Sequence, residues 1–353
     1  MSSLDTEHYL DQTGEWLKGE GPESDIVISS RARLARNVEG FPFSHRASGE
    51  KLQSIQEDVR SRLDNLDSLG EYEYVEVDQI SDLDTSFLAE RHLISSELAE
   101  VDWERGVAVT PDERVSIMVN EEDHLRIQSI RSGCNLEETW EQLNKLDDEL
   151  ESFVKYAFSP KYGYLTACPT NAGTALRVSV MLHLPVLNLA NQMDNVFQSL
   201  SKVNFTSRGL YGEGTQASGD LYQISNQVTM NKSEEDFINQ MNEMIPEIVK
   251  FEREWRDRML EERPTELKDR IYRAAGTLSN AYSISSDEAT ECLSALRLGI
   301  SLDLIDMPLS RVNRMFLFAQ PAHLQKKLDL ELNKEQRDQH RASYLRESVK
   351  PHL

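Results

Sequence analysis

Apolar residues follow two different periods along this chain, and each period predicts an element type. Over residues 115–119 they alternate with other side chains, which predicts a strand that ends at an acidic segment, residues 120–123. Residues 25–30 form a second short β-rich run, and this run leads into an arginine-dense segment, residues 31–36. These two strands therefore both end at charged residues.

A spacing of three to four residues between apolar side chains predicts helices elsewhere. It occurs over residues 48–69 and again from Asn135 onward, where Asn135 and Glu138 have the spacing of a capping box. Residues 233–261 have the pattern of one long charged helix, which Pro264 would end. We therefore expect helices both inside the strand-containing half and after it.

The remaining pattern divides the chain into parts. Residues 162–227 are rich in glycine with short β-like runs between the glycines, whereas the chain from residue 265 onward is helical in pattern. Ser285 and Glu288 have capping-box spacing, and the charged tail over residues 331–353 is also predicted to be helical. The expected parts are a loose N-terminal arm (1–23), a mixed α/β (α+β) domain (24–255) and a helical C-terminal domain (256–353).

Composition narrows the class of protein. The 353 residues carry 38 Lys and Arg against 61 Asp and Glu, a formal net charge of −23, which argues against a nucleic-acid binder because such proteins present basic surfaces. No apolar run approaches the roughly 18 residues that a membrane span needs, and the N-terminus lacks a signal-peptide pattern. Three cysteines without a CxxC pair predict neither a disulfide framework nor a zinc site. We expect a soluble, cytoplasmic protein.

The arginines are the first group of residues that could form a binding site. Arg31, Arg33 and Arg36 are crowded after a predicted strand with no carboxylate among them, and Arg126, Arg177 and Arg208 adjoin acidic or glycine-rich motifs. Planar guanidinium groups bind phosphate oxygens in pairs, so a converging set could neutralise a triphosphate. Each arginine alone could equally pair with a surface carboxylate, but the clustering favours an anion site.

Two further segments carry candidate groups. The acids in Asn120-Glu121-Glu122-Asp123 could bind Mg²⁺, hold a cationic substrate or cap a solvated turn. Cys168, which starts Cys-Pro-Thr-Asn-Ala-Gly-Thr, could be an exposed reactive thiol or a structural one. Neither the P-loop nor the dinucleotide glycine motif is present, and the histidines lack metal-ligand spacing.

The ordered segments together resemble the signature motifs of phosphagen (guanidino) kinases. The matching stretches are Ser29–Arg33, Asn120–Arg126, Cys168–Arg177, Arg208–Gly214 and Ile224–Asn226. Near the C-terminus, Gln320–Gln325 and Arg337–Ala342 are similar to the extension of bacterial protein arginine kinases of the McsB type. The resemblance implies a phosphagen-kinase catalytic domain, with a largely antiparallel sheet flanked by helices, followed by a helical domain used for dimerisation and phosphoarginine binding.

The resemblance also implies roles for individual residues. Glu122 would orient the substrate and act as candidate base, with Glu121 beside it, Glu213 as a second guanidinium-binding carboxylate and Cys168 at the reactive-cysteine position. The residues implied for ATP binding are Ser29, Arg31, Arg33, His92, Arg126, Arg177 and Arg208. No residue is expected to bind metal directly, because Mg²⁺ would be held by the nucleotide phosphates.

Some features depart from metabolic phosphagen kinases. Met181 stands where those enzymes often have a nucleotide-contacting histidine, and Gln223 replaces an aspartate. Only about 25 residues precede the first motif, so the N-terminal helical domain that closes over small substrates is not expected. In the C-terminal part, Arg337 and Asp338 would bind the phosphate and guanidino nitrogens of phosphoarginine, unless they are a neighbouring charge pair on a solvated helix.

The resulting hypothesis is an ATP- and Mg²⁺-dependent protein arginine kinase that acts on exposed arginines of other proteins. By the same resemblance, it would mark proteins for a Clp-type protease, work with an McsA-type activator and form a homodimer or higher oligomer, without binding nucleic acid or membranes. Two alternatives stay open: a metabolic arginine kinase acting on free arginine, and a non-catalytic phosphoarginine-binding regulator.

Overall fold

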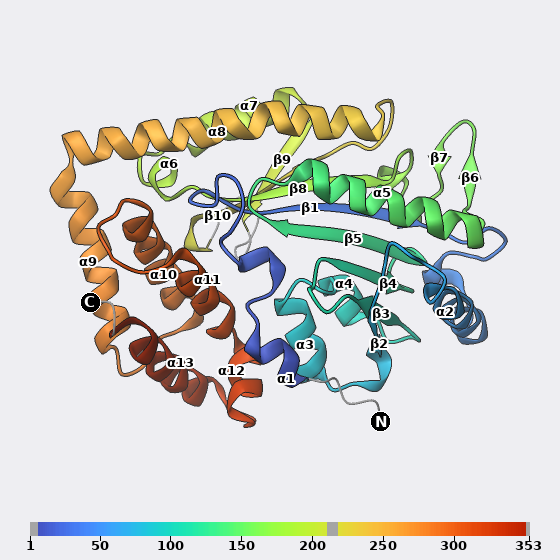
Figure 1. Ribbon diagram of the computed structural model, residues 1–353, viewed down its shortest axis with the longest axis horizontal. Coiled ribbons are helices and arrows are strands. Elements are labelled where there is room, and N and C mark those ends of the chain that lie inside the picture. The colour runs from blue at the N-terminus through green and yellow to red at the C-terminus, as the bar shows by residue number, and fades with distance from the viewer. Residues whose placement is uncertain (1–5, 210–217, 351–353) are drawn as a thin grey trace.

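An eight-stranded antiparallel sheet forms the centre of the protein (Figure 1), in the strand order β2-β3-β4-β5-β1-β8-β10-β9. The computed structural model describes residues 6–209 and 218–350. A separate two-stranded hairpin projects beside this sheet. The strands are β1 (Val27–Arg36), β2 (Glu73–Glu76), β3 (Gly106–Val109), β4 (Val115–Val119), β5 (Leu125–Ser132), β6 (Phe158–Ser159), β7 (Gly163–Tyr164), β8 (Leu176–His183), β9 (Phe205–Gly209) and β10 (Leu221–Asn226).

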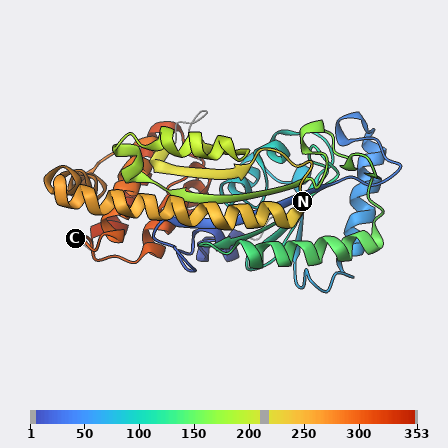
Figure 2. The same cartoon turned by 90° about the horizontal axis from the view of Figure 1, so that it is seen from above.

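Helices cover both faces of the sheet and continue beyond it. Figure 2 shows that the helices after α8 gather at one end of the molecule, whereas α2 and α5 lie at the opposite end. The helices are α1 (Thr6–Asp11), α2 (Gly49–Leu63), α3 (Asp82–Glu90), α4 (Ser96–Glu100), α5 (Leu136–Phe153), α6 (Pro185–Leu189), α7 (Met193–Lys202), α8 (Glu234–Glu262), α9 (Pro264–Asn280), α10 (Ser286–Ser301), α11 (Leu309–Phe318), α12 (Pro321–Leu328) and α13 (Lys334–Val349). Short 3₁₀ turns occur at η1 (Glu15–Leu17), η2 (Ser44–Arg46), η3 (Val77–Gln79), η4 (Pro169–Asn171) and η5 (Ser218–Asp220).

One face of the sheet is a continuous apolar surface. Because side chains alternate along a strand, Leu34 on β1, Val178 on β8 and Ile224 on β10 point to the same side, and all three are fully buried. They pack in one core cluster with the apolar stripes of α5 and α8. This packing fixes the register, since a one-residue slip would expose the apolar set.

The opposite face is covered only in part. At the β2–β4 side, Val107 and Met118 pack against α3 and α4. At one end of the central strands, Ile28, Ile130 and Met181 pack with the C-terminal helices. The polar positions of β1, β5 and β8 lie between these two apolar clusters, and this is where the candidate site forms.

Several sequence-based expectations about elements are confirmed. The strand at residues 115–119 is β4, and the long charged helix is α8. Of the capping box expected at the start of α10, one half is present, in which Ser285 accepts a hydrogen bond from the Glu288 backbone N–H. The expected antiparallel sheet with flanking helices and a helical C-terminal region is also observed. The boundary expected after residue 255 falls inside α8, which continues without a break.

Two expectations are wrong. The described N-terminal residues, from Thr6 onward, are not a loose arm, because Tyr9, Trp16 and Leu17 are buried in the two apolar clusters of the partly covered face. Asn135 does not form a capping box either: its side-chain amide donates to the Ser132 carbonyl oxygen at 2.7 Å instead of accepting from the helix.

Among the described helices, none combines the length and apolar composition needed to cross a membrane.

Candidate functional site

The strand register places the predicted phosphate-binding arginines on one face of the sheet. Arg31 and Arg33 are alternate residues of β1, and Arg33 lies directly opposite Arg177 of β8. On β5, Arg126 lies opposite Ala35, and Ala35 points to the same face of the sheet as Arg31 and Arg33. Arg208 on β9 pairs with Gln223 on β10 and so shares this face. Alternation along four strands thus brings together five arginines that are far apart in sequence.

The arginine face is strongly cationic and poorly neutralised by the protein. Burial, together with Arg126 and Arg177, lowers the pKa of Arg31 to about 10. Burial and the neighbouring arginines also lower the pKa of Arg33 and of Arg177. The Nε atoms of Arg33 and Arg177 are buried without a hydrogen-bond partner among the described residues. These orphaned donors fit a polyphosphate, which would supply both charge and acceptors.

Polar residues of β10 orient two of the arginines. Arg31 Nη2 donates to Gln223 Oε1 at 2.7 Å, and Arg177 Nη2 donates to Ser225 Oγ at 3.2 Å. Gln223 therefore orients Arg31 through a neutral amide oxygen and adds no negative charge to the arginine face. Arg208 is exposed at the edge of the face, where a nucleotide could reach it.

The acidic segment after β4 is mostly buried, so the solvated-turn alternative is wrong. Asp123 Oδ1 accepts hydrogen bonds from Asn37 Nδ2 at 2.6 Å and from the Ala167 backbone N–H at 2.7 Å. His124 Nδ1 accepts from the Val38 backbone N–H, and its other ring nitrogen contacts the Pro42 carbonyl oxygen. These contacts tie the segment to the loops around it.

The two candidate glutamates have different surroundings. Glu121 is buried, forms an ion pair with Arg126 and accepts a hydrogen bond from Ser95 Oγ. Burial opposes the charge on Arg126, but Glu121 and Glu97 outweigh this effect and raise its pKa. Glu122 is exposed and has no ion-pair or hydrogen-bond partner in the described part of the chain. Glu121 is thus engaged in holding an arginine, whereas the carboxylate of Glu122 is available to a ligand.

Glu122 lies at a cavity that also opens onto the arginine face. The cavity has a volume of about 150 Å³, and its lining includes Arg33, Glu122, Arg126 and Arg177. Partial burial and the charges of Asp123 and Glu121 raise the pKa of Glu122, while Arg126 opposes the shift. A carboxylate and three arginines that are predicted to bind phosphate therefore border one small space, which is the arrangement that transfer between a phosphate and a cationic acceptor requires.

Cys168 lies on the loop that borders this cavity. Its Sγ is 3.0 Å from Thr170 Oγ1, and the side chain is half-buried. The Thr229 hydroxyl donates to the carbonyl oxygens of Thr170 and Ala172, which fixes the loop. Glu213, the second predicted carboxylate, lies outside the described residues.

The other predicted nucleotide residues lie at the margin of the arginine face. His92 follows α3, and its pKa is lowered to about 3 by burial and by Arg31 and Arg33. Ser29 is buried on β1 opposite Ser132. Ser29 follows Ile28, which packs with the C-terminal helices, and the His92 ring stacks on Trp16 of the same apolar cluster.

Arg36 does not belong to the anion-binding group. Its guanidinium is buried, binds Asp147 through two nitrogens and lies over the Tyr164 ring at 3.5 Å. This pair joins β1 to α5 on the opposite face of the sheet. The structure brings Arg31 and Arg33 together on the arginine face, whereas Arg36 is paired with Asp147 on the other face, so the grouping expected from sequence is wrong for Arg36.

The predicted phosphoarginine pair lies on α13, remote in sequence from the arginine face. Arg337 Nη1 donates to the Leu332 carbonyl oxygen at 2.8 Å. Asp338 Oδ1 accepts from Arg341 Nη1 at 2.6 Å, and Arg341 is buried. Asp338 is therefore paired with Arg341 within α13, and Arg337 is bound to the main chain at the start of the same helix.

Sequence reasoning missed the residues that hold the site in place. Ser95 orients Glu121, Asn37 orients Asp123 and Gln128 binds the His92 carbonyl oxygen. Only Asn37 had a nearby signal, because it directly follows the arginine-dense segment. Within the described ranges, 6–209 and 218–350, no group of three or more His, Cys, Asp or Glu side chains could hold a metal ion.

Comparisons with known proteins identify the family to which the chain belongs. Residues 54–255 match the family model of the ATP:guanido phosphotransferase C-terminal catalytic domain, and residues 264–352 match that of the protein-arginine kinase McsB C-terminal domain. A protein-arginine kinase of Halothermothrix orenii is 43% identical over 94% of this chain and 95% of its own length. One of Pelotomaculum thermopropionicum is 44% identical over 94% of each chain.

Solved structures with the same fold extend the comparison. The duplicated taurocyamine kinase from Schistosoma mansoni, with bound transition state analog components, has a TM-score of 0.59 at 27% identity. The similarity covers 69% of this chain and 35% of that one, so this chain matches about a third of the duplicated protein. A lombricine kinase, at 24% identity and a TM-score of 0.57, shares the fold over 69% of this chain and 70% of its own.

Proposed function

Because this chain belongs to the ATP:guanido phosphotransferase family, as one of its protein-arginine kinases, we propose that it transfers the γ-phosphoryl group of ATP to arginine side chains in proteins. The observation that carries this proposal is the exposed carboxylate of Glu122, which lines one cavity together with Arg33, Arg126 and Arg177. An enzyme of this class must hold a cation and a polyphosphate next to each other, and the cavity borders both kinds of group.

The arginine face would hold the nucleotide phosphates. Arg31, Arg33, Arg126, Arg177 and Arg208 would surround the phosphate oxygens and offset the charge that develops during phosphoryl transfer. Mg²⁺ bound to the same phosphates would supply further neutralisation. The protein side chains are held in place before the nucleotide arrives, because Glu121, Gln223 and Ser225 already orient Arg126, Arg31 and Arg177.

Glu122 would hold the substrate guanidinium. A guanidinium has a pKa above about 12 and is a poor nucleophile while protonated, so alignment and proton removal both matter. In the proposed step a guanidino nitrogen forms a bond to the γ-phosphorus, the bond from that phosphorus to the β-bridging oxygen breaks, and ADP leaves. The proton lost from the nitrogen passes to the Glu122 carboxylate. Glu213 would bind the guanidinium from a second side, and a Cys168 thiolate would add negative charge nearby.

The exposure of Glu122 favours a protein substrate. A carboxylate that is open to solvent can reach an arginine on the surface of another protein, and the net charge of −23 would attract basic segments. The experiment that tests this proposal offers labelled ATP and Mg²⁺ with either a basic model protein or free arginine. We expect acid-labile label on the protein. Label on free arginine alone would support the metabolic alternative, and no label on either would support a non-catalytic regulator.

The C-terminal domain would recognise the product. We propose that Arg337 binds the phosphate of phosphoarginine and that Asp338, which pairs with Arg341 through one carboxylate oxygen, binds its guanidino nitrogens. Calorimetric titration with free phosphoarginine tests this assignment. Arg337→Ala should abolish binding, whereas the same substitution at exposed Arg273 on α9 should leave binding unchanged.

We also infer cellular roles that follow from the family. The enzyme would act in the cytoplasm as a homodimer or higher oligomer, with an McsA-type activator, and would mark proteins for a Clp-type protease. The match of residues 264–352 to the McsB C-terminal domain supports this inference.

A further inference from the structure

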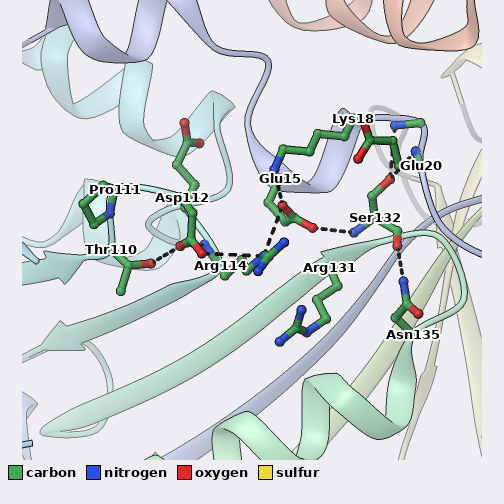
Figure 3. A network of polar contacts seen from close by, with 12 residues as sticks. Glu15, Lys18, Glu20, Thr110, Pro111, Asp112, Arg114, Arg131, Ser132 and Asn135 are labelled. Carbon is green, nitrogen blue, oxygen red and sulfur yellow. Dashed lines mark hydrogen bonds and ion pairs between the residues drawn. The ribbon is translucent and has the colours of Figure 1, made fainter. Parts of the chain in front are cut away.

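The segment before β1 is fixed against the sheet by Glu15. Its carboxylate forms ion pairs with Lys18 at 2.6 Å and with Arg114 at 3.3 Å, and it accepts a hydrogen bond from the Ser132 backbone N–H at 3.4 Å (Figure 3). Ser132 Oγ in turn accepts from the backbone N–H groups of Gly19 and Glu20. Glu15 is itself buried, so these contacts hold η1 in one position on β5.

Trp16, the residue after Glu15, stacks on His92, which is predicted to bind the nucleotide. The rings of Trp16 and His92 are 4.1 Å apart between centroids, and their planes differ by 17°. Trp16 is 1% exposed, and its Nε1 is buried with no hydrogen-bond acceptor among the described residues. A buried donor without an acceptor costs free energy, so the contribution of Trp16 comes from its aromatic surface.

His92 connects this stack to the arginine face. Its backbone has a positive φ of 61°, and its carbonyl oxygen accepts a hydrogen bond from Gln128 Nε2 at 2.6 Å. Gln128 is the residue opposite Arg33 in the β1–β5 ladder. The His92 ring is close enough to Arg31 and Arg33 for their charges to lower its pKa. The ring therefore stays neutral, and its position depends on the Trp16 plane on one side and on Gln128 through the main chain.

We propose that Trp16 is a positioning residue of the nucleotide site, which acts by holding the His92 ring beside Arg31 and Arg33. This inference rests on the proposed function, since it takes His92 and the arginine face as the ATP site. It assigns part of that site to the N-terminal segment, outside the residues that match the catalytic-domain model, 54–255. A neutral ring held next to phosphate-binding arginines offers a flat surface to a nucleotide without competing for its charge.

Binding of Mg²⁺–ADP by isothermal calorimetry tests the proposal without any phosphoryl acceptor. Trp16→Leu should weaken ADP binding about three- to tenfold, the range expected from the loss of one aromatic stack. Trp16→Phe keeps an aromatic plane and removes the unsatisfied N–H, so it should restore most of the affinity. In turnover assays Trp16→Leu should raise KM for ATP by the same factor and change kcat less than twofold.

A matched control separates positioning from general loss of stability. Trp140 lies on α5 and packs on the opposite face of the sheet, so Trp140→Leu should lower the unfolding temperature without changing ADP affinity. The double variant Trp16→Leu with His92→Leu should lose no more affinity than His92→Leu alone, because Trp16 acts through His92.

The ADP-binding results distinguish a failure of this inference from a failure of the proposed function. If wild type binds ADP and Trp16→Leu binds it equally well, Trp16 is only structural and the inference fails while the proposed function stands. Additive losses in the double variant would also contradict it. If wild type does not bind Mg²⁺–ADP at all, the proposed function fails first.

Discussion

Arg33 and Arg177 lie directly opposite each other across the β1–β8 ladder, on the same face of the sheet. Like charges in this position repel, and each arginine keeps a buried Nε without a hydrogen-bond partner among the described residues. Burial and neighbouring arginines lower the pKa of both groups. The unliganded protein therefore stores an electrostatic cost at the place where the phosphates are proposed to bind.

Removing one of these charges should stabilise the free protein and impair nucleotide binding. We expect Arg33→Met to raise the free energy of unfolding by about 1 kcal/mol, because it removes repulsion and keeps the length of the side chain. It should weaken Mg²⁺–ADP binding at least about tenfold, as expected for lost hydrogen bonds to a charged group.

Urea unfolding with and without Mg²⁺–ADP measures both effects of Arg33→Met. Arg60→Met is the control, because Arg60 is paired with Glu76 on the surface. It should change neither the stability nor the ADP affinity by much. A clear loss of stability in Arg33→Met without ADP would contradict this view of the arginine face.

Substitution of Glu121 and substitution of Glu122 should impair different steps of the reaction. Glu122→Gln should lower kcat about 10²- to 10⁴-fold with little change in ADP affinity, because Glu122 is proposed to hold the substrate guanidinium and is the candidate base. Glu121→Gln should instead weaken nucleotide binding, since Glu121 holds Arg126 and accepts from Ser95. Steady-state kinetics together with ADP titration distinguishes the two patterns. The reverse assignment of effects would mean that Glu121 is the residue that contacts the substrate.

The activity should also depend on pH through Glu122. Burial and the charges of Asp123 and Glu121 raise the pKa of Glu122 above the ordinary 4.5, and only the ionised form can hold a guanidinium or accept its proton. Activity should therefore fall as pH falls through this raised pKa. Asp123→Asn removes a negative charge but keeps the oxygen that accepts from Asn37 and Ala167, so it should move the acid limb to lower pH.

Profiles of kcat/KM against pH measure this shift, with Glu100→Gln at an exposed position as the control. An acid limb that stays in place or moves upward in Asp123→Asn would show that Glu122 ionisation does not govern the profile.

Glu90 should be important for the contact between the catalytic part and the C-terminal helices. Its carboxylate accepts from the backbone N–H groups of Ala322 and His323 at the start of α12, at 2.8 and 3.0 Å. Glu90→Ala leaves both groups and the His323 ring without this acceptor, at a cost of about 2–3 kcal/mol in unfolding free energy. Urea unfolding, with exposed Glu100→Ala as the control, measures the loss. Equal stability of the two variants would rule out this role.

Local pattern was sufficient for much of the fold and part of the site. Alternation along β4 and the three- to four-residue spacing of α8 are properties of short segments, so the sequence predicts both elements correctly. The placement of Arg31 and Arg33 on one side of β1 follows from the same alternation. Their convergence with Arg177 depends on the order of strands in the sheet, which local pattern does not determine. The motif resemblance named Arg177 as a member of the same set but gave no strand order.

Long-range partners explain what the sequence could not predict. Arg36 binds Asp147, which is 111 residues away, and nothing near Arg36 distinguishes it from Arg33. The burial of Asp123 depends on the backbone of Ala167, and that of Trp16 depends on the C-terminal helices. In each case a charged or N-terminal residue has a role that is set by tertiary contacts.

Direct detection of phosphoarginine on a protein tests the central claim. The purified enzyme is incubated with Mg²⁺–ATP and a basic model protein, and the product is analysed by mass spectrometry under conditions that preserve the phosphorus–nitrogen bond. The account predicts phosphate on arginine side chains with the wild type and almost none with Glu122→Gln. Phosphate only on hydroxyl side chains, or equal arginine phosphorylation by Glu122→Gln, would contradict it.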